Sequence, residues 1–418
     1  MYVCMSPNVS FAQDILCPAG IAIQPDAPGY VPGKDGWVFS EWDLRSEFAI
    51  EEDAKPFIAR MVKALESKGI TLIAIPIPSR GIVNADKVDP SQALAANFSQ
   101  ALAIQNYLAS LKEYEALGIM TVNPLEYLKE NTSALDFERD MHWTPQGARQ
   151  IAKAVAATLA NVPAFQAMSK NTFTVTETGT TDYTGVYSDD VAELCGQPLA
   201  TQPLQRYELT GGADVGLLDS ASPDMMLLGT SFSNGQFSFD SFLKESTGID
   251  ILPISINGGS RWYALEQLFT NPATPLPKII LWEFPAKVVE GWEANFIRRV
   301  TPMIYGACAP EASLVAQDTT LVALQETILL QSPEGIPIQG ANSFLVLDIL
   351  DLAVTNFLLN FKYQDGTQEA VRVDRNFQVE NTGQFLLELT DGETLLTEVT
   401  FSDSTYAGNI SGRVCHIQ

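Results

Sequence analysis

The segment Leu227-Leu-Gly-Thr-Ser-Phe-Ser-Asn-Gly235 passes from apolar residues into a Gly-Thr-Ser turn. An apolar run of strand length is typical of a parallel strand that is covered on both faces. We therefore expect a buried strand that ends at this turn and is followed by a helix. Open α/β folds keep their functional sites at the carboxyl ends of such strands, which makes Ser231 a candidate nucleophile. Thr and Ser are also ordinary helix caps, so the segment alone leaves both roles open.

Strands and helices alternate on both sides of this segment, from residue 50 to residue 285. Apolar residues at helical spacing, with Pro in the first turn and Gly after the last, mark the helices. The predicted strands are residues 70–78, 119–123, 225–229, 249–255 and 278–284, and the predicted helices are residues 57–65, 97–117, 145–159 and 261–269. The fold class is therefore α/β, in a domain that we place at residues 13–305.

The tail has a different pattern, with short apolar runs separated by turn residues. Two of these turns contain Asp-Gly, which is a strong hairpin signal. The predicted strands are residues 320–330, 344–350, 356–363, 369–373, 384–389 and 397–401. The tail, residues 306–418, is therefore predicted to be an all-β sandwich.

The length of the chain indicates the number of domains, and its charge excludes some classes of partner. A chain of 418 residues is longer than a single hydrophobic core usually supports, which agrees with two domains. Its formal net charge of −25 leaves no basic patch for a phosphate backbone or an anionic membrane, so nucleic acid is excluded as a partner. The sequence contains no apolar stretch of the ~18 residues that a membrane-spanning helix needs.

The cysteines indicate an oxidising compartment. Cys17 and Cys195 bracket the first half of the chain, and Cys308 and Cys415 bracket the tail. None of the five cysteines forms a Cys-x-x-Cys or Cys/His pattern, so no metal site is predicted. Pairs that close long loops suit structural disulfides, although unrelated buried thiols are the alternative. Disulfides would imply that the protein is exported.

The first residues support export in a weaker way. Ser10-Phe11-Ala12 resembles the small-x-small site of a signal peptidase, although no basic segment precedes it. We expect residues 1–12 to be the remnant of a signal peptide, with the mature chain beginning near Gln13.

Histidine is scarce in this chain. Of the two histidines, His416 lies two residues from the C-terminus, so imidazole chemistry falls to His142. Asp140 precedes it by two residues, and in an extended segment such side chains point the same way. The carboxylate would then accept the Nδ1 proton and leave Nε2 facing a nucleophile. A capping loop with local hydrogen bonds is the alternative.

Two further residues lie at the ends of predicted strands. Gly258, in Asn257-Gly-Gly-Ser260, allows close backbone approach and is a candidate oxyanion donor through its N–H, with a plain turn as the alternative. Arg80 follows the first strand and is a candidate for orienting a carboxylate or polarising an acyl group. A structural ion pair is an equal alternative for Arg80.

Several motifs together resemble one family. They are Lys34-Asp-Gly-Trp-Val-Phe39, Ser79-Arg-Gly-Ile-Val-Asn84, Asp140-Met-His-Trp-Thr-Pro-Gln-Gly-Ala-Arg149, Leu228-Gly-Thr-Ser231 and Leu281-Trp-Glu-Phe284. This set resembles the alginate O-acetyltransferases of the AlgX/AlgJ type. The resemblance implies an SGNH-hydrolase-like α/β/α domain with the triad Asp140, His142 and Ser231. It also implies that the tail is a carbohydrate-binding module and that Cys17 pairs with Cys195 and Cys308 with Cys415. Met141 stands where the family often has His.

The resemblance also implies a function and a location. We expect a periplasmic enzyme that needs no cofactor and acetylates a secreted exopolysaccharide, alginate, through an acetyl-serine. A membrane acyltransferase would supply the acetyl group, and secretion-complex proteins would be partners. Arg372 and Arg375, among four basic residues of the tail, are the expected polysaccharide contacts. The alternatives are a polysaccharide acetyl esterase and a non-catalytic polysaccharide-binding subunit of a secretion complex.

Overall fold

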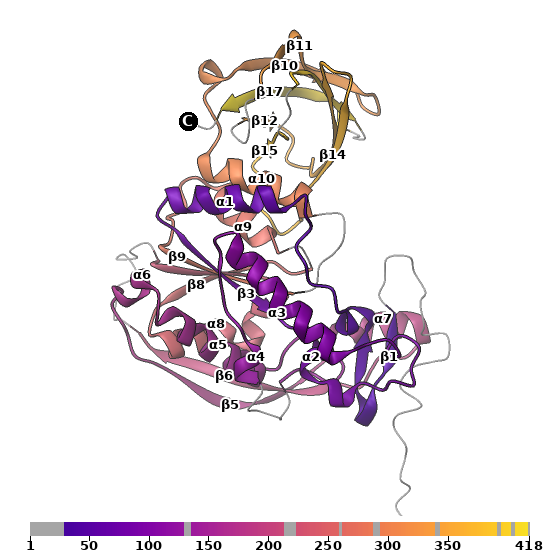
Figure 1. Ribbon diagram of the computed structural model, residues 1–418, viewed down its shortest axis with the longest axis vertical. Coiled ribbons are helices and arrows are strands. Elements are labelled where there is room, and N and C mark those ends of the chain that lie inside the picture. Colours follow the sequence, from indigo (N-terminus) through magenta and orange to yellow (C-terminus); the bar gives the residue numbers. More distant parts are fainter. Residues whose placement is uncertain are drawn as a thin grey trace, which may run out of the picture.

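The computed structural model describes residues 29–128, 135–212, 223–258, 261–286, 293–338, 343–390, 394–402 and 406–416. It has a larger α/β part and a smaller β part that lies above helices α1 and α10 (Figure 1). The predicted signal remnant and Cys17 lie outside the described residues.

A five-stranded parallel sheet forms the centre of the larger part. Its strands, in order across the sheet, are β4 (Met120–Thr121), β3 (Thr71–Ile77), β9 (Ile279–Pro285), β7 (Met225–Gly229) and β8 (Ile251–Ser255). The three central strands are almost fully buried, as their continuous apolar sequences predict. Because the strands are parallel, β3, β7 and β9 end at the same edge of the sheet.

Helices cover both faces of this sheet. Leu72 and Leu228 pack against one group of helices, and Ile73 and Leu227 pack against the other, because side chains alternate along a strand. The first group is α1 (Lys55–Ser67), α9 (Tyr263–Thr270) and α10 (Glu293–Tyr305), and the second is α5 (Pro145–Leu159) and α8 (Phe239–Thr247). The predicted α/β/α architecture is confirmed.

Further elements surround these layers. They are β1 (Tyr30–Pro32), β2 (Val38–Ser40), α2 (Arg80–Val83), α3 (Gln100–Ala116), α4 (Leu125–Leu128), α6 (Pro163–Gln166) and α7 (Val186–Cys195). A two-stranded antiparallel sheet of β5 (Phe173–Tyr183) and β6 (Gln202–Gly211), with α7 in the connection between them, lies along the outside of the domain (Figure 1). These two strands are absent from the predicted elements, because most of the side chains of β5 are exposed and polar and show no apolar periodicity. Its repeated threonines, which favour strands, were the available signal.

The segment after β7 also differs from its prediction. Two short 3-10 turns, η4 (Ser231–Ser233) and η5 (Gly235–Phe237), precede α8, which begins only at Phe239. The expected helix therefore starts eight residues after Ser231 rather than at it. Ser238, which has a positive φ of 58°, separates the second turn from the helix.

The tail is a sandwich of two four-stranded antiparallel sheets, as predicted. One sheet is ordered β10 (Val315–Leu321), β17 (Gly408–His416), β12 (Ser343–Ile349) and β15 (Gln384–Glu388), and the other β11 (Thr327–Ile336), β16 (Leu396–Ser402), β13 (Asn356–Tyr363) and β14 (Gln368–Asp374). The run expected at residues 320–330 is split between two strands, and β17 was not predicted. The predicted Cys308–Cys415 disulfide is present, with an S–S distance of 1.90 Å.

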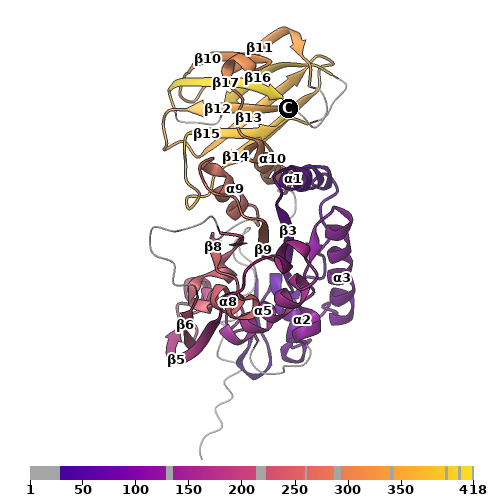
Figure 2. The same ribbon diagram turned by 90° about the vertical axis from the view of Figure 1, so that its left-hand side faces the viewer.

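Buried ionic contacts join the two parts. Helix α10 ends at Tyr305, just below the sandwich (Figure 2). Its Arg298 donates from Nε to the Glu388 carbonyl oxygen (2.8 Å) and from Nη1 to Oε1 of Glu369 (2.6 Å), while Arg60 of α1 pairs with the Glu388 carboxylate. Removing one partner of these pairs would leave a largely buried charge without its counter-ion, so they favour one arrangement of the two surfaces.

Candidate active site

The structure brings the three predicted triad residues together. Asp140 and His142 lie on the loop 135–144, which a β-bridge between Asp136 and Trp143 closes, and Ser231 begins η4 directly after β7. His142 Nδ1 donates to Asp140 Oδ1 at 2.5 Å, and the Ser231 hydroxyl lies 2.8 Å from His142 Nε2. This order of acid, imidazole and hydroxyl is the geometry of an activated serine.

Asp140 is held as a carboxylate inside the protein. Its Oδ1 also accepts the His142 N–H (2.7 Å), and its Oδ2 accepts the Tyr183 hydroxyl (3.2 Å) and the Val186 N–H. Burial by itself raises the pKa of Asp140, but the bonds from His142 and Val186 outweigh it and lower the pKa from its ordinary value. Gly185 permits this approach, because a Cβ there would lie 2.7 Å from the Asp140 side chain.

Aromatic rings hold the imidazole of His142. The centroid of the Phe232 ring lies 4.7 Å and that of Phe237 5.1 Å from the centroid of the His142 ring. Trp143 Nε1 donates to the Phe232 carbonyl oxygen (3.0 Å), which ties the histidine loop to the serine turn. His142 is only 3% exposed, so its ring has little freedom to turn away from Ser231.

Glu283 is a site residue that sequence analysis did not single out. It lies at the carboxyl end of β9, is fully buried, and accepts hydrogen bonds from Thr230 N–H (2.9 Å), Thr230 Oγ1 (2.9 Å) and Ser233 Oγ (2.7 Å). Burial raises its pKa, although these bonds act against the shift. Gly229 leaves room for this arrangement, since a Cβ there would lie 2.2 Å from Ser233 Oγ. The available signal was an acidic residue inside the apolar run Leu281-Trp-Glu-Phe284.

Arg80 has the structural role that sequence analysis left open. Its guanidinium pairs with Asp43 at 2.8 Å and donates to the carbonyl oxygens of Val38, Phe137 and Glu138. The side chain is 2% exposed, so Arg80 ties the histidine loop to the β2 region from within the protein. The structure does not place its charged end on a surface where it could clamp a ligand carboxylate.

Gly258 lies three residues beyond the end of β8, on an exposed bend with a φ of +68°. The neighbouring Asn257 N–H donates to Gln378 of the tail (2.7 Å), so this loop contacts the sandwich. The proposed role of Gly258 as an oxyanion donor stays a prediction.

The two expected polysaccharide contacts have different environments. Arg372 is exposed on β14. Arg375 is 4% exposed, and it donates to Asn381 (3.0 Å) and to the Gln384 carbonyl oxygen (2.9 Å). It also lies 3.5 Å from Glu266 of α9. The expectation of a polymer contact is therefore corrected for Arg375, because its guanidinium is enclosed at the junction of the two parts.

The other predicted cysteine pair has only one described member. Cys195 ends α7, whereas Cys17 lies outside the described residues, so their pairing stays a prediction. Among the described side chains, no group of three or more His, Cys, Asp and Glu is arranged to hold a metal ion.

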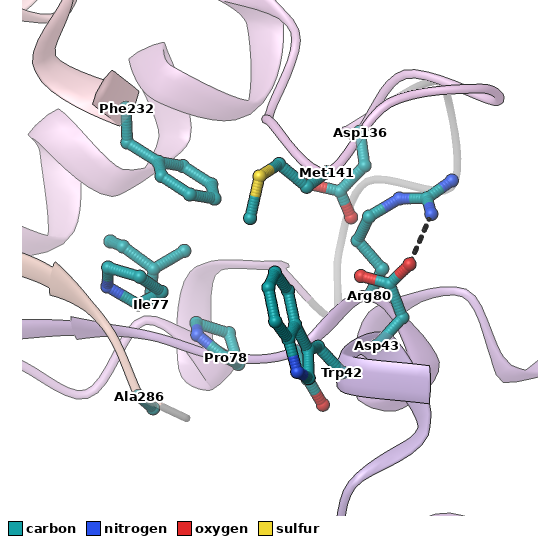
Figure 3. Close-up of a pocket in the computed structure, with 11 residues that line it drawn as sticks. Trp42, Asp43, Ile77, Pro78, Arg80, Asp136, Met141, Phe232 and Ala286 are labelled. Carbon is teal, nitrogen blue, oxygen red and sulfur yellow. Dashed lines mark hydrogen bonds and ion pairs between the residues drawn. The ribbon is translucent and has the colours of Figure 1, made fainter. Parts of the chain in front are cut away.

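A pocket lies beside the triad (Figure 3). Met141, between Asp140 and His142, and Phe232, directly after Ser231, form part of its wall. The complete lining is Trp42, Asp43, Ile77, Pro78, Ser79, Arg80, Asp136, Met141, Phe232, Pro285 and Ala286. The pocket therefore opens where strands β3 and β9 end, next to the candidate nucleophile.

Comparison with known proteins places this site in a family. The family model described as "SGNH hydrolase-like domain, acetyltransferase AlgX" matches residues 30–286. The chain belongs to this AlgX family. It is 31% identical over 372 residues to the alginate biosynthesis protein AlgX of Pseudomonas aeruginosa, covering 86% of this chain and 77% of the relative. The predicted family resemblance is confirmed.

Further relatives support the assignment of the chain to the AlgX family. A solved structure of Pseudomonas aeruginosa AlgX superposes with a TM-score of 0.83 at 26% identity, covering 96% of this chain and 100% of that one. The probable alginate O-acetylase AlgJ of Pseudomonas aeruginosa is 25% identical over 284 residues, covering 62% of this chain and 70% of the relative. The AlgX matches therefore extend over more of the chain than the AlgJ match.

Proposed function

We propose that this chain is an O-acetyltransferase that moves acetyl groups onto hydroxyls of a secreted exopolysaccharide, alginate, through an acetyl-serine at Ser231. The observation that carries this proposal is the continuous hydrogen-bonded series from Asp140 through His142 to Ser231. The relatives named as alginate biosynthesis proteins and alginate O-acetylases support the choice of acetyl group and polymer.

The first half-reaction forms the acetyl-enzyme. His142 Nε2 takes the Ser231 proton while Oγ attacks the carbonyl carbon of the donor ester. The tetrahedral intermediate then expels the donor alcohol, which receives the proton from His142. Asp140 keeps its hydrogen bond to Nδ1 throughout and stabilises the imidazolium. Glu283 holds the turn that carries Ser231, because it binds Thr230 and Ser233 on either side of it.

The second half-reaction transfers the acetyl group. A sugar hydroxyl gives its proton to His142 Nε2 and attacks the acetyl carbonyl, and collapse of the intermediate returns the proton to Ser231. An acetyl esterase would use the same residues with water in place of the sugar. The relatives named as alginate O-acetylases favour transfer over hydrolysis.

Location and partners belong to the same proposal. The Cys308–Cys415 disulfide supports a periplasmic enzyme, since such bonds persist in oxidising compartments. No helix among the described residues has the length and apolar character needed to cross a bilayer. We propose that a membrane acyltransferase system delivers the acetyl group and that the chain works beside secretion-complex proteins.

The test is acetyl transfer from a chromogenic acetyl ester to oligomannuronate, followed by mass spectrometry of the oligosaccharide. Ser231→Ala should abolish both ester turnover and transfer, whereas Ser91→Ala, at an exposed serine that bonds Asp89, should retain both. Turnover that yields only free acetate in the presence of oligosaccharide would instead identify an esterase. Failure of a serine-directed inhibitor to label Ser231 would identify a non-catalytic binding subunit.

A further inference from the structure

The pocket beside the triad has an apolar side and a polar end (Figure 3). Trp42, Met141 and Phe232 form much of the apolar side, while the paired Asp43 and Arg80 and the separate carboxylate of Asp136 lie at the polar end. A pyranose ring has the same division, with apolar C–H faces and a rim of hydroxyls. Pockets that combine an aromatic wall with a few fixed polar groups are typical ligand sites.

We propose that this pocket is the acceptor subsite, in which Trp42 lies against a pyranose ring and Asp136 accepts hydrogen bonds from its hydroxyls. This inference rests on the proposed function, because it names where the sugar sits during the second half-reaction. The Phe232 ring lines this pocket and also lies 4.7 Å, centroid to centroid, from the His142 ring, so the pocket and the imidazole share one wall.

The aromatic wall is held in place. Trp42 belongs to the 3-10 turn η2 (Glu41–Leu44), which a capping box of Ser40 and Asp43 begins. Asp43 Oδ2 accepts the Ser40 N–H (2.8 Å), the Tyr187 hydroxyl (2.7 Å) and the Arg80 guanidinium (2.8 Å). Because three donors fix this carboxylate, the turn that carries Trp42 is held before a ligand binds, which lowers the ordering cost of binding.

The polar end selects hydroxyls over carboxylates. Arg80 is neutralised by Asp43, so the ionised Asp136 leaves this group with a negative charge that repels an anionic ligand group. Asn84 donates to Asp136 Oδ2 (2.6 Å) and fixes the carboxylate. A uronate should therefore bind with its hydroxyls inward and its carboxylate outside.

The ionisation of Asp136 supports its role as an acceptor for sugar hydroxyls. Burial raises its pKa to about 6, with Asp43 adding to the shift and Arg80 and Asn84 opposing it. Ionised carboxylates accept stronger hydrogen bonds than neutral acids do. Binding of the acceptor should therefore weaken as the pH falls through about 6.

The experiment measures binding of oligomannuronate by calorimetry in the inert Ser231→Ala protein. Adding Trp42→Ala or Asp136→Asn to this protein should each raise the Kd for oligomannuronate about tenfold, because each removes one good contact. Trp42→Phe keeps an aromatic ring and should bind near the Ser231→Ala level, which separates lost stacking from misfolding. The matched control is Leu102→Ala, an exposed position on α3.

Two results would overturn the assignment of this pocket as the acceptor subsite. Unchanged Kd in both Trp42→Ala and Asp136→Asn would place the acceptor elsewhere. Unchanged oligomannuronate binding together with a raised KM for the acetyl ester, measured in the same two variants with Ser231 intact, would make this the donor pocket. Because binding is read in a protein that cannot react, failure of acetyl transfer would refute the proposed function without changing this result.

Discussion

Replacing Asp140 by Asn tests the role of the buried carboxylate, because it changes one atom and removes one charge. In the native protein each carboxylate oxygen accepts two hydrogen bonds, from the ring and backbone of His142 on one side and from Tyr183 and Val186 on the other. An amide has only one oxygen. If that oxygen faces His142, the amide nitrogen meets the Val186 N–H, which is a backbone donor that cannot turn. One buried donor without a partner costs about 1–3 kcal/mol of unfolding free energy.

The effect on rate should exceed the effect on stability. If the amide nitrogen instead faces His142, it favours the tautomer with the proton on Nε2, which cannot accept the Ser231 proton. In either orientation the imidazolium loses its charged partner. We expect kcat for acetyl-ester turnover to fall about 10³–10⁴-fold, less than the ~10⁶-fold loss that removing the serine or histidine of a triad produces. Steady-state kinetics and urea unfolding of the same preparations measure the two effects.

Glu266→Gln is the matched control for Asp140→Asn. Glu266 is another buried carboxylate, but it lies 3.4 Å from Arg299 and 3.5 Å from Arg375 at the junction of the two parts. This change should lower the unfolding free energy and leave kcat near the native value. Near-native kcat in Asp140→Asn, with the expected loss of stability, would show that Asp140 only supports the loop and would refute the triad.

Three other changes probe stability. Burial raises the pKa of Asp136 to about 6, so ionisation of this residue lowers the unfolding free energy as the pH rises. Between about pH 4 and pH 7 in urea titrations, the unfolding free energy of the native protein should fall by up to about 3 kcal/mol more than that of Asp136→Asn. Arg298→Ala should cost about 3 kcal/mol of unfolding free energy and separate the calorimetric transitions of the two parts, because it removes the cationic partner of Glu369 and the donor to the Glu388 carbonyl oxygen. The double change Cys308→Ser and Cys415→Ser should cost about 3–5 kcal/mol in guanidinium unfolding, since the bond closes a loop spanning 107 residues.

Each of these changes has a control. Asn84→Ala, which removes the fixed donor to Asp136, should enlarge the pH dependence, because that hydrogen bond opposes the rise in the pKa of Asp136. Lys278→Ala breaks an exposed pair with Asp224 and should cost below about 1 kcal/mol, in contrast to Arg298→Ala. Native protein treated with reductant should lose at least as much unfolding free energy as the double cysteine variant, because reductant would also break the predicted Cys17–Cys195 bond. Equal stability of the oxidised and reduced native protein would contradict the loop-closure argument.

Much of the fold could be predicted because its signals are local. The apolar run of β7 and the Thr144 and Pro145 start of α5 lie within a few residues of the structure they form. The two-stranded sheet of β5 and β6 could not be found in the same way, because β5 carries mostly exposed polar side chains. Apolar periodicity reports burial, so a strand that buries little leaves little trace in it.

In the candidate site, too, contacts between residues close in sequence were predictable and contacts between distant residues were not. Asp140 and His142 are two residues apart, so their contact was predictable from the period of an extended chain. Glu283 escaped notice because its partners, Thr230 and Ser233, are some 50 residues away in sequence. The sequence predicts a polymer contact at Arg375, because it does not show that Glu266 and Phe385 enclose the guanidinium.

The succession of strands and helices along the chain, the β tail, His142 as the candidate base and the family resemblance are all readable from the residues alone. The contact between the Ser231 hydroxyl and His142, 89 residues apart, and the pocket near them depend on how the elements pack. Helix and strand preferences depend on residues within a few positions of one another in the chain. A site forms where packing of the sheet brings the ends of distant strands to one edge.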